Sequence, residues 1–215
     1  MATKVPSQAS RIRNSLLLCF ALASFSLSLF AVPDDWKYEE THQDSRDFIS
    51  GGSVHVHMTV GDLRIRRGDS NKIRLEYTVK SHHEKNVKDS HVDFDVHGKD
   101  ATIEFHAPSG GNTNFDVELE VPLSTNLDVH EKVGDLKVEN IEGDKYLELG
   151  VGDIRVANEK AGYRLINAST GIGDVNSPGY GETSGWLGKT LKYHGEGKYE
   201  LRAHVGVGDI HLDGK

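Results

Sequence analysis

Apolar and polar residues alternate strictly along much of the chain after residue 50. The alternating segments are residues 54–58, 73–77, 92–96, 103–105 and 115–121. Because successive side chains of a β-strand point to opposite faces, a period of two predicts strands with one face on a core. Glycine-rich turns separate these segments, and no window of eleven residues shows a helical period. The pattern therefore predicts an all-β domain.

A four-residue repeat, apolar-Gly-Asp-apolar, occurs five times. Its central residues are Gly61 and Asp62, Gly134 and Asp135, Gly152 and Asp153, Gly173 and Asp174, and Gly208 and Asp209. A second series of short apolar-x-apolar segments interleaves at residues 127–129, 147–149 and 163–165. Successive aspartates at positions 135, 153 and 174 are 18 and 21 residues apart.

Two short strands and two turns in each period of 18–21 residues are typical of one coil of a β-solenoid. Each coil buries its inward side chains against the neighbouring coils. The glycine allows a backbone turn that a Cβ would obstruct, and the aspartate can accept hydrogen bonds from turn N–H groups. We predict a solenoid over residues 48–215, preceded by an irregular linker at residues 32–47, and we interpret the Gly-Asp residues as structural.

The first 31 residues have the layout of a secretory signal peptide. Lys4, Arg11 and Arg13 precede an apolar segment that ends at Ala31, where we place the cleavage site. This segment is shorter than the about 20 residues that span a bilayer comfortably. The protein is therefore predicted to be exported to the periplasm, the outer surface or the medium. An uncleaved N-terminal anchor is the alternative, and it would be the only membrane contact.

Removal of the three basic residues with the signal lowers the formal net charge from −8 to −11 and leaves no cysteine. An acidic chain without a basic cluster is not expected to bind nucleic acid. The absence of a mature cysteine and of a Gly-x-Ser-x-Gly motif argues against nucleophilic catalysis. We predict no catalytic residue and no cofactor.

Two patterns could bind a metal ion. His55 and His57 project from the same face of a predicted strand and could chelate a transition metal, with His82, His83 and His91 as further candidates. The repeated aspartates could stack and bind calcium. A solvated strand face and turn hydrogen bonds are the favoured interpretations, so no metal site is predicted.

The segments Gly51 to Val56, Val60 to Ile65 and Val121 to Val129, together with the Gly-Asp repeats, resemble the bacterial putative-adhesin β-strand-repeat family. That family is related to the head domains of autotransporter adhesins. The resemblance covers roughly residues 43–213. It implies an exported right-handed, single-stranded β-solenoid associated with the envelope or the cell surface, and it supplies no catalytic residues.

The function predicted from these features is that of a non-enzymatic envelope or surface protein, an adhesin or an assembly scaffold. Its partner would be a surface ligand or a protein. The alternative is a polysaccharide lyase or hydrolase on a β-helix, which would need carboxylates and an arginine in a groove on one face.

The last repeat ends three residues before Lys215. If it forms the end of the solenoid, Ile210 and Leu212 lie on an open edge that could dock a second copy or a partner chain. Alternatively, the irregular segment Ser177 to Gly197 folds back as a cap, using Trp186 and Leu187. We favour the docking edge, because the strands after this segment look regular.

Overall fold

A computed structural model describes residues 36–68, 71–110, 112–158 and 160–214, and these residues are mostly strand. The strands are β1 (Tyr38–Asp47), β2 (Ser53–Arg67), β3 (Lys72–Ser81), β4 (His91–His97), β5 (Asp100–His106), β6 (Thr113–Val121), β7 (Asn126–Val133), β8 (Leu136–Glu139), β9 (Lys145–Val151), β10 (Ile154–Asn158), β11 (Tyr163–Ile172), β12 (Val175–Asn176), β13 (Thr190–His194), β14 (Tyr199–Val207) and β15 (Ile210–Gly214). One short helix, α1 (Glu84–Asp89), and a 3₁₀ turn, η1 (Lys160–Gly162), interrupt them. The all-β prediction is confirmed, and the proposed signal peptide lies outside the described residues.

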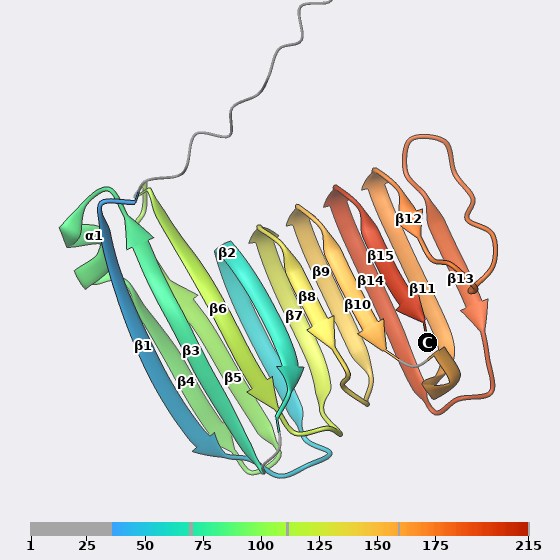
Figure 1. Cartoon of the computed structure of the whole chain (residues 1–215), viewed down its shortest axis with the longest axis horizontal. Coiled ribbons are helices and arrows are strands. Elements are labelled where there is room, and N and C mark those ends of the chain that lie inside the picture. Colours follow the sequence, from blue (N-terminus) through green and yellow to red (C-terminus); the bar gives the residue numbers. More distant parts are fainter. Residues whose placement is uncertain (1–35, 69–70, 111, 159, 215) are drawn as a thin grey trace, which may run out of the picture. The chain divides into compact units, whose positions relative to one another are not determined.

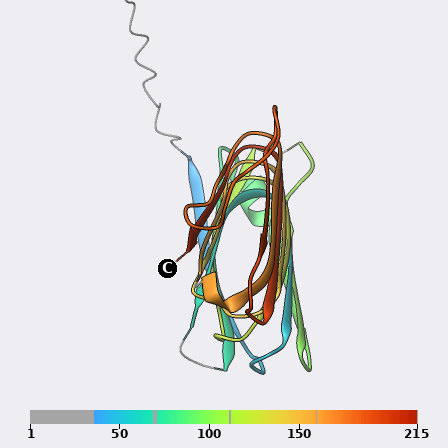
Figure 2. The same ribbon diagram turned by 90° about the vertical axis from the view of Figure 1, so that its right-hand side faces the viewer.

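The strands form two sheets that face each other across one core (Figures 1 and 2). Sheet A runs in the order β1, β3, β6, β2, β8, β10, β15, β12. Sheet B runs in the order β4, β5, β2, β7, β9, β14, β11, β13. The long strand β2 belongs to both sheets and turns from one to the other at Gly61.

Each of the four later coils consists of a sheet B strand, a Gly-Asp corner and a sheet A strand. The coils are β7–β8, β9–β10, β14–β15 and β11–β12, and neighbouring coils pair in parallel in both sheets. In-register pairing aligns the inward side chains in rows, such as Val129, Leu147, Ala203 and Ala168. All four are buried, so each coil completes its core only against its neighbours.

The coils do not stack in the order of the sequence. Figure 1 shows the deep red coil β14–β15 between β9–β10 and β11–β12. Ile210 therefore pairs with Ile154 on one side and with Val175 on the other, and its side chain is buried. The predicted docking edge at Ile210 and Leu212 is wrong, because the connection after β12 carries the chain back to fill a position inside the stack.

Antiparallel strands cover the two ends of the stack. At one end β13 pairs with β11, and its Leu191 is fully buried. Part of the segment Ser177 to Gly197 thus forms the cap that was the less favoured alternative. Trp186 and Leu187 are not the capping residues, since they are 90% and 63% exposed.

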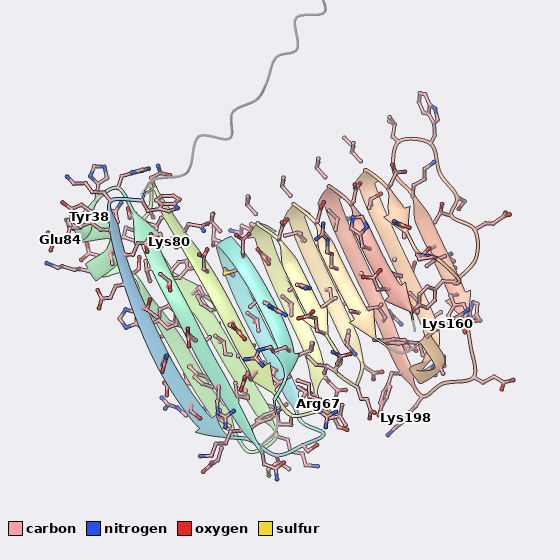
Figure 3. The ribbon with its side chains drawn as sticks, in the orientation of Figure 1. Tyr38, Arg67, Lys80, Glu84, Lys160 and Lys198 are labelled. Carbon is pink, nitrogen blue, oxygen red and sulfur yellow. The ribbon has the colours of Figure 1, made fainter. Side chains whose placement is uncertain are left out.

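At the other end β1 pairs with β3, and β4 pairs with β5, while α1 lies beside them (Figure 3, where Tyr38 and Glu84 mark this end and Lys160 the opposite one). Residues 38–47 are therefore a regular strand, and the prediction of an irregular linker is wrong there. Strand β1 has mostly exposed polar residues, which hid its period of two. Charged side chains on an edge strand discourage pairing with further chains.

One of the predicted strand patterns shifts its register. The segment 163–165 was expected to point Tyr163 and Leu165 into the core. Tyr163 is buried as expected, but a bulge between Tyr163 and Leu165 changes the faces that follow. Ile166 and Ala168 are buried, whereas Leu165 is only half-buried. An unpaired extra residue of this kind reverses the faces that follow it.

The Gly-Asp corners stack directly on one another. All five glycines have φ between +131° and +153°, and a Cβ on Gly152 would lie 1.7 Å from the carbonyl oxygen of Gly134. Four of the five aspartate carboxylates accept the backbone N–H of the aspartate in the next coil, at 2.7–3.1 Å. The order of this chain of hydrogen bonds is Asp62, Asp135, Asp153, Asp209 and, as the last donor, Asp174. The aspartates thus bind backbone N–H groups of the neighbouring coil, whereas the sequence predicted hydrogen bonds within each turn.

One acidic side chain lies in the core beside these corners. Glu131 occupies the inward row of Met58 and Leu149, is 3% exposed, and its carboxyl fills the space over Gly134 that a Cβ would take. Among the residues that the structure describes, neither carboxyl oxygen has a hydrogen-bond partner. Burial, together with the negative charges of Asp62 and Asp135, raises the pKa of Glu131 to about 8. Glu131 is therefore held in its neutral form at neutral pH.

Replacement of Gly152 by Val should destabilise the protein far more than replacement of Asp153 by Asn. The valine Cβ meets a backbone carbonyl at a positive φ, and the expected loss exceeds about 3 kcal/mol of unfolding free energy. Asparagine keeps an oxygen for the Asp209 N–H, so about 1 kcal/mol or less should be lost. Chemical denaturation of both variants measures the difference, and equal losses would contradict the stacked-corner geometry.

Replacement of Glu131 by Gln should change how stability depends on pH. Because folding raises the pKa of Glu131 from 4.5 to about 8, its stabilising contribution is complete below about pH 4.5 and is lost as the pH rises through about 8. The variant should melt about 10 °C or more above the wild type at pH 9 and at nearly the same temperature at pH 5. Thermal melts between these limits test this, with the exposed Glu182→Gln as control. Melting curves that stay parallel across the pH range would show that Glu131 does not titrate in the fold.

Candidate functional site

A row of exposed aliphatic residues follows the corner between the two sheets. The residue before each turn glycine pairs in register with its equivalent in the next coil. We call this row the corner ladder, and it consists of Val60, Val133, Val151, Val207 and Ile172. These side chains are 36–56% exposed. Their exposure follows from the corner, because the chain leaves sheet B before they could reach the core.

Bare backbone flanks the corner ladder on its sheet B side. Gly150, Gly206 and Gly171 stack in neighbouring coils, where a Cβ on each would lie 2.5 Å from the next carbonyl oxygen. At its last rung the ladder continues onto the loop before β13. The N–H of Gly173 donates to the carbonyl oxygen of Leu187, which brings the exposed Leu187 beside Ile172. The result is a long apolar strip with a flat shoulder, next to the 90% exposed Trp186.

The outer face of sheet B carries a second regular row, of histidines and carboxylates. Across the strands, pairing aligns Glu104, His57, His130, Glu148 and His204. The same side chains line a shallow groove of about 600 Å³. His130 is held between two acids, with Nδ1 3.1 Å from Glu148 Oε2 and Nε2 3.1 Å from Asp128 Oδ1.

His55 and His57 lie on this outer face, as their spacing predicted, but they have different partners. His55 Nδ1 lies 3.1 Å from Asp128 Oδ2, while the His57 ring stacks on His130 with centroids 5.3 Å apart. The two imidazoles therefore do not converge on one point. Among the described residues, three ligand groups converge instead at His91, Asp93 and His106.

Of these three residues, only His91 was among the metal-ligand candidates predicted from the sequence. His106 on β5 follows His91 and Asp93 on β4 by 15 and 13 positions, and the antiparallel pairing of the two strands brings the three side chains together. The alternation of apolar and polar residues predicts which face of a strand a side chain lies on. It does not predict the register between two strands, which decides the neighbours of each side chain.

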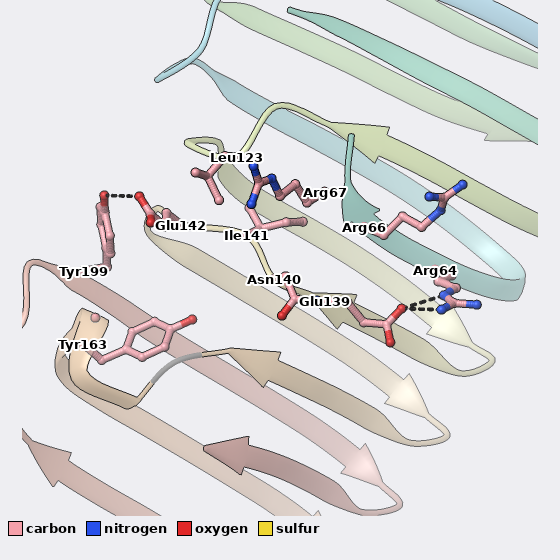
Figure 4. A pocket seen from close by; sticks show the side chains of 11 residues that line it. Arg64, Arg66, Arg67, Leu123, Glu139, Asn140, Ile141, Glu142, Tyr163 and Tyr199 are labelled. Carbon is pink, nitrogen blue, oxygen red and sulfur yellow. Dashed lines mark hydrogen bonds and ion pairs between the residues drawn. The ribbon is translucent and has the colours of Figure 1, made fainter. Parts of the chain in front are cut away.

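A hollow at the opposite corner has the composition that an enzyme site would need (Figure 4). It measures about 570 Å³ and is lined by Arg64, Arg67, Glu139, Glu142 and Tyr199, among others. Its carboxylates are engaged. Glu139 binds Arg64 at 2.6 Å, and Glu142 accepts a hydrogen bond from Tyr199 Oη at 3.4 Å.

The charge state of Glu139 does not suit a proton donor. Burial raises the pKa of Glu139, but hydrogen bonds from Lys137 and Arg64 outweigh this effect and hold it below its usual range. A glycosidase or lyase acid requires the opposite shift. The arrangement is that of a surface ion pair, comparable to the Lys80–Asp116 and Arg74–Glu120 pairs elsewhere on sheet A.

None of the helical segments that the structure describes has the length and apolarity to cross a bilayer. No curated protein matches the chain. A solved structure of a "putative cell adhesion protein" from Clostridium sporogenes superposes with a TM-score of 0.51 at 17% identity, over 82% of this chain and 100% of that one. The superposition shows a shared fold.

Two further solved structures align with lower TM-scores. A "putative adhesin" from Bacteroides fragilis covers 80% of this chain and 97% of its own, with a TM-score of 0.36 and 12% identity. A "putative lipid binding protein" from Parabacteroides distasonis covers 83% and 96%, with a TM-score of 0.27 and 12% identity. The family description Toastrack DUF4097 matches residues 53–177, which is more than half of the chain. The matched residues run from β2 to β12 along the chain and include four of the five Gly-Asp corners, so the chain belongs to the Toastrack DUF4097 family.

Proposed function

We propose that this protein is a non-enzymatic, exported envelope or surface protein, folded as a right-handed single-stranded β-solenoid, that assembles through its corner ladder. The exposed aliphatic row carries this proposal. Contiguous apolar surface is uncommon on monomeric proteins and marks sites of association. The cell adhesion description of the Clostridium structure supports the same class of function. The engaged carboxylates of the hollow in Figure 4 favour binding over carbohydrate catalysis.

The occupant that fits the corner ladder best is the ladder of a second copy. Neighbouring strands lie about 4.8 Å apart, so the five rungs repeat with that spacing over about 19 Å. A second ladder has the same spacing, and its β-branched side chains can interdigitate with the first. The glycine shoulder formed by Gly150, Gly206 and Gly171 leaves room for close approach.

The charges beside the ladder select one arrangement of the two copies. The aspartate row lies on the sheet A side of the ladder and the glycine shoulder on the sheet B side. A two-fold axis parallel to the ladder places the aspartates of each copy over the shoulder of the other, which keeps like charges apart. The contact is narrow, so we expect weak, reversible association.

Aspartates at the central rungs should abolish this association. The double variant Val151→Asp/Val207→Asp places two charges in the middle of the apolar strip, and both side chains are about half exposed, so the fold should tolerate them. Sedimentation velocity at micromolar concentrations should show a dimer for the wild type and a monomer for the variant.

The matched control is Ile49→Asp. This residue is 55% exposed and apolar but lies away from the ladder, so the variant should dimerise like the wild type. A wild type that is monomeric throughout, or a ladder variant that dimerises equally well, would refute assembly through the ladder.

A further inference from the structure

We infer that His91, Asp93 and His106 form a binding site for a divalent transition metal, with Zn²⁺ as the ion that fits best. The site lies on the outer face of sheet B at its β4 edge, away from the corner ladder. It is independent of the assembly proposed above.

Strand pairing builds the cluster from two pairs of outward residues. His91 lies directly opposite His106, and Asp93 lies directly opposite Glu104, in the antiparallel pair β4–β5. Opposite side chains in such a pair have Cβ atoms about 4.5–5.5 Å apart. Residues two apart on one strand project from the same face, so all four side chains point into one patch.

The ligand atoms already lie close together. His106 Nε2 is 3.2 Å from Asp93 Oδ2 and 3.8 Å from Glu104 Oε2, and the rings of His91 and His106 stack with centroids 4.8 Å apart. One ligand atom from each of His91, Asp93 and His106 lies within 4.8 Å of the others. Ligands about 2.0–2.1 Å from a tetrahedral zinc ion are themselves about 3.3 Å apart, so small rotations of the side chains complete the site.

The types of the ligands favour zinc over harder ions. Two imidazoles and one carboxylate suit zinc and its transition-metal neighbours, whereas calcium and magnesium require mainly oxygen ligands. Glu104 can supply the fourth ligand, and water is the alternative. His106 Nε2 is shielded from solvent and faces two carboxylates without hydrogen-bond geometry. A cation between these groups would satisfy all of them.

Metal binding at this place would fasten the edge of the sheet. Of the strands that the structure describes, β4 pairs with β5 alone, so it is a cap strand held on one side. An ion shared by His91 on β4 and His106 on β5 links the cap to the stack. Because such an ion binds the folded state and not the unfolded chain, it stabilises the fold by an amount that grows with the logarithm of its concentration above the dissociation constant.

Calorimetric titration of the chelator-treated full chain with Zn²⁺ tests the site. We expect one Zn²⁺ per chain for the wild type and an affinity at least about 10-fold lower for His106→Ala, because a direct ligand is lost. With Co²⁺ in place of Zn²⁺, the wild type should show the intense visible absorption of a tetrahedral site, and His106→Ala should not.

His97→Ala is the control, because His97 projects from the same face of β4 as His91 but pairs with Asp100 at the far end of the strand. Its zinc affinity and Co²⁺ spectrum should equal those of the wild type. Absence of zinc binding to the wild type would overturn the inference. An equal loss in His97→Ala and His106→Ala would also overturn it, since the ion would then bind the face without a defined site.

Discussion

The contact between Gly-Asp corners of neighbouring coils sets the spacing of the whole stack. At each corner the α-carbon of a glycine lies against a carbonyl oxygen of the next coil, where a Cβ would be 1.5–2.0 Å away in the four later coils. The aspartate that follows fixes the same contact through its bond to the neighbouring backbone N–H. Because this spacing is set at the corner, the inward rows align in both sheets and bury a continuous core.

The same constraint produces the exposed surface. A chain that turns at a fixed glycine exposes the residue just before it, so five aliphatic side chains become one straight row. The corner also explains Glu131, whose carboxyl occupies space that exists because Gly134 has no side chain. Core packing, the corner ladder and the buried acid are thus three consequences of one backbone geometry.

Much of the fold could be predicted from the sequence. The strict alternation at residues 54–58 and 115–121 and the five Gly-Asp repeats correctly indicated strands and coil corners. The order of the coils could not be predicted, because every repeat has the same corner and can stack on any other. If the coils stacked in the order of the sequence, Ile210 would lie at an open end, as we predicted. In the structure, β15 lies between β10 and β12. Because the repeats are alike, their sequences do not show which coil each one packs against.

The candidate sites could also be predicted only in part. Outward positions such as His55 and His57 were predicted from the period of two, and the aliphatic residue of each repeat was visible in the motif. Its exposure was not, because a period of two assigns such a residue to the core until the corner geometry is known. The cluster of His91, Asp93 and His106 depends on the register of two strands, which emerges only when they pair.

Engineered disulfides can establish whether the corners stack out of sequence order. His211 lies in register with Arg155 on one side and with Asn176 on the other, and neighbouring strands are within disulfide range at about 4.8 Å. With Cys19 replaced by Ser, cysteine pairs at 155 and 211 and at 176 and 211 should both oxidise within one chain. A pair at 155 and 176, two coils apart, should not. Mass spectrometry of unreduced peptides gives the result, and a disulfide between 155 and 176 without one between 155 and 211 would show that the coils follow the order of the sequence.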